Sequence, residues 1–162
     1  MPMLDVTIPD GALSGDAERK LLAQLTDILL EHEGADPTDP HVRSIALVFL
    51  HRPAATFVAG APELDPHYRI VASVPEGQFD DERRQAMVAA VTDAVLDAED
   101  GTRARDPMRV WVFATQVPDG TWGGAGRVFR LEDILAFVAG VPEWARREAD
   151  ARLSRARQPA TT

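Results

Sequence analysis

Pro2, directly behind Met1, is the residue of this chain whose position alone suggests chemistry. Methionine is commonly removed before a small second residue, and its removal here would leave a secondary amine at the chain terminus. A strand-like run follows, and if that strand carries the amine into an apolar pocket, desolvation lowers its pKa. Because an α-amino group titrates near ~8, a modest shift makes it a general base at neutral pH. Pro2 is therefore a candidate catalytic base or acid.

The composition limits the other kinds of chemistry. The chain has 162 residues, of which 45% are hydrophobic and 27% charged, as expected for one globular domain. A net charge of −9 argues against binding to nucleic acid, and the absence of cysteine excludes disulfides, thiolate catalysis and thiolate zinc sites. No apolar stretch is long enough to span a bilayer and no signal-peptide pattern opens the chain, so we expect a soluble, cytoplasmic protein without membrane contacts.

The strand and helix pattern that must position Pro2 occurs twice in the sequence, at an offset of 66 residues. Thr26 of the first copy, for example, recurs as Thr92 of the second. Each copy starts with alternating apolar residues, as a half-buried strand does, and a Pro-Xaa-Gly turn then breaks the strand. Ser14 in the first copy and Asp80 in the second are expected to cap a helix. The apolar stripes of the two predicted helices are Leu21, Leu22, Leu25, Ile28 and Leu29, and Met87, Val88, Val91, Ala94 and Val95.

Each copy closes with a second strand, near 44–51 and 109–115. The run 110–113 is typical of a fully buried strand, so we expect Trp111 to pack in the core. A right-handed crossover makes the two strands of each βαβ unit parallel. The predicted fold class is α/β (α+β): a tandem βαβ repeat forming a four-stranded mixed sheet with both helices on one face. The other face would be bare, which favours an oligomer.

We expect a single domain over 2–138, with repeats at about 2–60 and 67–126. A C-terminal extension over 139–162 follows, with a short helix near 131–138 preceding it. The arginine-rich stretch from Trp144 is interpreted as an exposed helix that frays, followed by a polar tail.

A tandem βαβ chain that begins Met-Pro resembles the tautomerase superfamily, which includes 4-oxalocrotonate tautomerase, macrophage migration inhibitory factor and malonate semialdehyde decarboxylase. The resemblance covers about residues 2–138. Its most specific motif is 117–126, VPDGTWGGAG, an aromatic residue followed by glycines after a strand. A second is Thr38-Asp39 ahead of His51-Arg52-Pro53, which is similar to the decarboxylase branch.

The resemblance implies a role for several residues. Pro2 matches the catalytic proline, whereas its counterpart in the second repeat is Tyr68, so only one half can be active. Arg109 matches the arginine that polarises the substrate carboxylate, and Trp122 falls where the family has an aromatic wall. Asp39 matches the acid of the decarboxylase branch, although that branch's paired arginines are absent.

The sequence also departs from the family pattern after the first strand, where the resemblance implies an arginine and none is present. That position is Ala12, and its duplicate is Gln78. These departures keep a second interpretation open, in which the chain is a catalytically silent binding protein with this fold.

The resemblance thus implies a cofactor-independent keto–enol tautomerase that acts on a small oxo or enol acid and assembles as a homotrimer. Pro2 would move the proton, Arg109 would hold the substrate with help from Arg43 or Arg52, and Trp122 would exclude water. No metal or organic cofactor is implied. Hydration or decarboxylation are the alternative activities.

Overall fold

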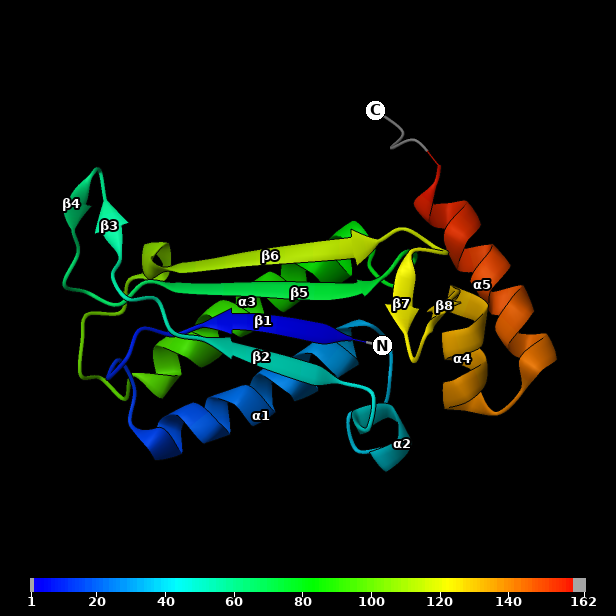
Figure 1. Cartoon of the computed structure of the whole chain (residues 1–162), viewed down its shortest axis with the longest axis horizontal. Coiled ribbons are helices and arrows are strands. Elements are labelled where there is room, and N and C mark those ends of the chain that lie inside the picture. Colours follow the sequence, from blue (N-terminus) through cyan, green and yellow to red (C-terminus); the bar gives the residue numbers. More distant parts are fainter. Residues whose placement is uncertain (1, 159–162) are drawn as a thin grey trace.

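A four-stranded mixed sheet in the order β2-β1-β5-β6 forms the centre of the computed structural model, which describes residues 2–158 (Figure 1). β1 (Met3–Thr7) runs parallel to β2 (Leu47–His51), and β5 (Tyr68–Pro75) runs parallel to β6 (Val110–Val117). The two pairs meet antiparallel, with Met3 opposite Ser73. This is the predicted mixed sheet of two βαβ units.

Two helices of 18 residues each, α1 (Gly15–His32) and α3 (Asp81–Ala98), cover one face of the sheet. They begin and end at positions that differ by the repeat distance. Ser14 and Asp80 cap them as predicted, each accepting a backbone N–H of the first turn. Their apolar stripes pack on the inward side chains of the strands, among them Leu4, Val6 and Ile70, to form the core.

No described part of the chain covers the opposite face of the sheet. Trp111 is 60% exposed and Phe113 is 42% exposed, and Leu47 and Phe49 on β2 lie on the same face. The prediction that 110–113 is fully buried is therefore wrong for the single chain. Alternate residues of β6 point to opposite faces, so that Val110 and Val112 enter the core while the two aromatic residues face outward.

A hairpin follows each βαβ unit. The first consists of β3 (Phe57–Val58) and β4 (Ala61–Pro62), and the second of β7 (Trp122–Gly124) and β8 (Arg127–Phe129). Both turn through an Ala-Gly pair with positive φ, at 59–60 and 125–126. Two consecutive residues with positive φ are the requirement of a type I′ hairpin turn.

The C-terminal extension is an ordered helical hairpin rather than a fraying helix. α4 (Leu131–Ala139) and α5 (Pro142–Ala156) pack on each other through Leu131, Leu135, Ala145 and Ala149, which form a second small apolar cluster. The pair lies at the end of the sheet where the chain begins (Figure 1). A helix was predicted from Trp144, and α5 confirms it, with most of its residues exposed. The prediction did not include its packing on α4, which depends on the buried Ala145 and Ala149.

Two short helical segments complete the described chain, α2 (Pro40–Arg43) before β2 and η1 (Pro107–Arg109) before β6. None of the helices in residues 2–158 is both long and apolar enough to cross a membrane.

Candidate functional site

Pro2 is buried at the end of the sheet where β1 begins, between the neighbouring strands β2 and β5. Its carbonyl oxygen accepts a hydrogen bond of 3.1 Å from Leu47 N in β2. On its other side, the pairing of Met3 with Ser73 places it beside the last residues of β5. The loop that enters β2 and the loop that leaves β5 therefore border Pro2.

A cavity of about 80 Å³ lies at this end of the sheet. The loop before β2 contributes Ile45, the loop after β5 contributes Gln78, and α5 contributes Trp144 and Arg152. The remaining lining residues come from the end of α1 and the turn after it, from α2 and from α4. All of them except Glu33 are apolar or glycine: Glu33, Gly34, Ala35, Val42, Ile134, Leu135 and Val138. Proline chemistry would need such a small, enclosed and largely apolar space.

Glu33 is the ionisable residue buried most deeply in the cavity lining, with 4% of its surface exposed. Its Oε2 is buried without a hydrogen-bond partner among the described residues. Burial raises the pKa of this carboxyl to about 7, although the positive charges of the amino terminus and of Arg152 act in the opposite direction. The carboxyl can therefore gain or lose a proton near neutral pH.

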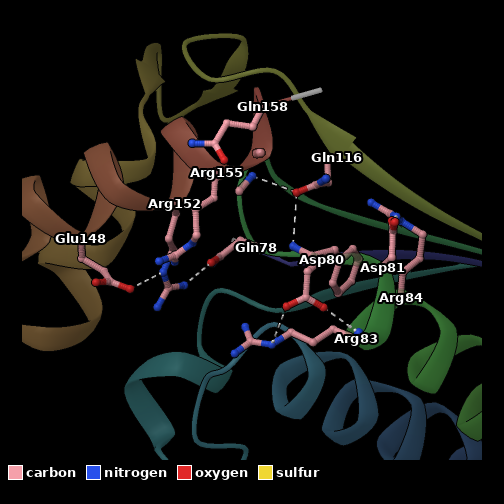
Figure 2. Close-up of a pocket in the computed structure, with 13 residues that line it drawn as sticks. Gln78, Asp80, Asp81, Arg83, Arg84, Gln116, Glu148, Arg152, Arg155 and Gln158 are labelled. Carbon is pink, nitrogen blue, oxygen red and sulfur yellow. Dashed lines mark hydrogen bonds and ion pairs between the residues drawn. The ribbon is translucent and has the colours of Figure 1, made fainter. Parts of the chain in front are cut away.

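Arg152 also lines a larger open cleft of about 590 Å³, whose lining residues are drawn in Figure 2. Its guanidinium donates to the side-chain oxygen of Gln78, and its Nε donates to Glu148 over 2.7 Å. Both Arg152 and Gln78 line the cleft as well as the cavity. The position where the family pattern has an arginine is thus occupied by a glutamine that binds an arginine from α5.

Arg109 lies at the other end of the sheet from Pro2. Val110, the next residue, pairs with Tyr68 at the start of β5, whereas Pro2 lies beside the end of that strand. At ~3.3 Å per residue the separation along β5 is roughly 15–20 Å. Within one chain, Arg109 and Pro2 therefore cannot hold the same small substrate.

The Arg109 guanidinium is instead part of a buried ion pair. It is 5% exposed and donates two hydrogen bonds of 2.6 Å to the two oxygens of Glu99. Tyr68 Oη donates to the same carboxylate over 2.9 Å. Burial alone would raise the pKa of Glu99, but the hydrogen bonds from Arg109 and Tyr68 outweigh it and hold that pKa below its usual value.

The predicted substrate residues of the first repeat lie around α2, with their side chains already paired. Arg43 donates to Asp27 and to the carbonyl of Pro37. Asp39 accepts a hydrogen bond of 2.7 Å from His41 N and caps α2. These side chains are tied to local structure rather than directed into the cavity.

Arg52 and Trp122 also lie away from the cavity. Arg52 follows β2 at the end of the sheet opposite Pro2, where it pairs with Glu18 over 2.7 Å. Trp122 opens β7, opposite Phe129, and is half-buried. Neither is among the described residues that line the cavity. Of the six predicted site residues, Pro2 and Arg109 are buried, and none of the six is among the residues that line the cavity. Pro2 lies at the same end of the sheet as the cavity, between the strands whose loops contribute Ile45 and Gln78 to its wall.

Sequence reasoning missed Glu33, Trp144 and Arg152. The signal for Glu33 was available, since the repeat distance relates it to Glu99 and both end an amphipathic helix. Trp144 and Arg152 gave no such signal, because they belong to α5, which has no counterpart in the repeat.

Solved structures with the same architecture identify the fold. A fused 4-OT described as a symmetric trimer superposes with a TM-score of 0.63 at 23% identity, covering 86% of this chain and 99% of that chain. Pt0534, solved after inactivation by 2-oxo-3-pentynoate, gives 0.63 at 22% identity, covering 78% and 94%. The chain has the tautomerase fold. Macrophage migration inhibitory factor of Toxoplasma gondii shares that fold, with a TM-score of 0.61 at 15% identity over 78% and 99%.

No protein-family model matches the sequence, and no curated protein matches it either. The tautomerase fold therefore rests on the architecture. In residues 2–158, no group of three His, Asp or Glu side chains is arranged to hold a metal ion.

Proposed function

We propose that the protein is a cofactor-independent keto–enol tautomerase in which the amine of Pro2, freed by removal of Met1, moves the proton of a small oxo or enol acid. The observation that carries the proposal is the burial of Pro2 at the end of the sheet whose neighbouring loops line a small cavity with one guanidinium, that of Arg152, in its wall. Desolvation at such a position favours the neutral amine.

The proposed reaction uses the groups at this end of the sheet. The substrate carboxylate pairs with Arg152, which can offer a planar pair of N–H donors. Neutral Pro2 takes a proton from the carbon beside the carbonyl, and the resulting ammonium returns a proton to another carbon of the dienolate. Arg152 thereby takes the role that the sequence assigned to Arg109, because Arg109 lies at the other end of the sheet from Pro2.

Substitution of Pro2 by alanine tests the proposal with phenylenolpyruvate as substrate. A primary amine replaces a secondary one and is less basic, so we expect ketonisation to fall at least ~10²-fold with the fold unchanged, in line with loss of a general base. Pro62→Ala, at an exposed proline of β4, is the matched control and should keep wild-type turnover. Equal turnover of P2A and wild type would refute amine catalysis.

A second candidate function is a catalytically silent binding protein with the tautomerase fold. Two observations favour it. Ala12 and Gln78 stand where the family pattern has arginine, and the guanidinium of Arg109 is bound to Glu99. Intact mass separates the two, since a retained Met1 converts the Pro2 nitrogen into an amide and excludes catalysis by that nitrogen.

The proposed assembly is a homotrimer. The uncovered sheet face with Trp111 and Phe113 supplies an apolar surface, and fused 4-OT structures of the same fold are described as trimers.

A further inference from the structure

The internal repeat relates three residues around Pro2 to three residues of the second half. Pro2 corresponds to Tyr68, and Arg43 corresponds to Arg109, each 66 positions apart. Glu33 corresponds to Glu99 in the same way, and both are buried residues at the C-terminal cap of an 18-residue helix. The second half therefore shows where a carboxyl at this position points.

In the second half, the carboxyl at this position points at the first residue of the inner strand and is fully paired. Glu99 accepts the Tyr68 hydroxyl and both ends of the Arg109 guanidinium. Nothing in this network is left to react, because both oxygens of Glu99 are bound.

In the first half, the same carboxyl lacks both of these partners. Pro2 has no hydroxyl, and Arg43 turns outward to Asp27 and the Pro37 carbonyl. Glu33 nevertheless stays buried, with Oε2 unpartnered and the cavity beside it. A buried acceptor without a partner costs about 1–3 kcal/mol in general, so its retention calls for a function.

The charged groups around Glu33 are few. Arg152 of α5 faces it across the cavity but is held by Gln78 and Glu148. Arg83 of α3 lies over Gly34, where an added Cβ would approach its Nη1 to 3.3 Å. The positive charges that act on Glu33 are those of Arg152 and of the amino terminus. Gln78, Ile45, Trp144 and the α4 residues bring no further charge to the cavity.

We propose that Glu33 is the acid–base partner of the Pro2 amine, so that the site holds one exchangeable proton between a carboxyl and a secondary amine. This inference depends on the proposed function of Pro2. As Pro2 takes a proton from one carbon of the substrate, the Glu33 carboxyl, in place of the pyrrolidinium, gives its own proton to the distal carbon of the dienolate. The pyrrolidinium then passes its proton to the Glu33 carboxylate, which restores the starting state with no net change in protons.

The experiment follows the labelling of Pro2 by 2-oxo-3-pentynoate as a function of pH, read by peptide mass spectrometry. The alkyne reacts with the free amine, so the labelling rate reports its fraction. An ionised neighbour stabilises the ammonium, and we therefore expect Glu33→Gln to lower the labelling midpoint by about one pH unit and to merge two coupled steps into one. Ketonisation by E33Q should fall ~10²-fold.

Two further variants keep the test interpretable. Glu31→Gln, at an exposed site two residues earlier on the same helix, should reproduce both wild-type curves. Glu33→Asp retains a titrating carboxyl and should keep the two-step titration, which separates charge from folding. If Pro2 of the wild type is labelled but the E33Q curve coincides with it, the role of Glu33 is refuted while that of Pro2 stands. If the wild type is not labelled at Pro2, the proposed function itself fails.

Discussion

Glu33 and Glu99 show how neighbours decide the state of two identical, equivalently placed residues. Three donor groups surround Glu99 and its pKa is lowered, whereas Glu33 is buried with one oxygen unpaired and its pKa is raised to about 7. The sequence made Pro2 recognisable, because its identity and place at the chain start carry the chemistry. The sequence could not reveal that Arg109 forms a buried ion pair with Glu99. An arginine at the start of a strand has the same sequence pattern whether its guanidinium is free or paired.

The raised pKa of Glu33 predicts a pH-dependent stability. A carboxyl whose pKa rises from 4.5 in the unfolded chain to about 7 in the folded one stabilises the fold fully below 4.5 and loses that contribution as pH rises through 7. We expect the free energy of unfolding to fall by about 3 kcal/mol over this range relative to E33Q. Urea titrations of both proteins across the range would measure it, and a constant difference would show that folding leaves the pKa of Glu33 unshifted.

At the scale of elements, the repeat was predictable, whereas of the extension only its helix was predictable and not the packing of that helix on α4. Caps, stripes and turns repeat at a fixed distance, so α1, α3 and the four central strands follow from local patterns. Helix α5 is rich in arginine and its contact with α4 depends on small alanines, which leave only a weak apolar signal. The bare face of the sheet was predicted, but Trp111 was expected in the core because a continuous apolar run does not reveal which of its residues point to that face.

At the scale of the whole molecule, the exposed sheet face is the feature that one chain leaves incomplete. Trp111, Phe113, Leu47 and Phe49 lie together on it, and a surface of this kind favours association.

Substitution of Trp111 by glutamate tests this assembly. The wild type should sediment with three times the mass of the chain, and Trp111→Glu should sediment as the single chain, because a charge on the interface cannot be desolvated cheaply. Leu64→Glu, at a side chain that is 96% exposed on a loop, is the matched control and should keep the wild-type mass. A wild type that sediments as a single chain would contradict the trimer.

The central claim is that a free secondary amine at Pro2 is buried and reactive. Intact mass spectrometry of the purified protein before and after treatment with 2-oxo-3-pentynoate, followed by peptide mapping, tests it most directly. We predict a mass that lacks Met1 and a single adduct on the Pro2 nitrogen. A protein that retains Met1, or one whose adduct lies on another residue, would contradict the claim.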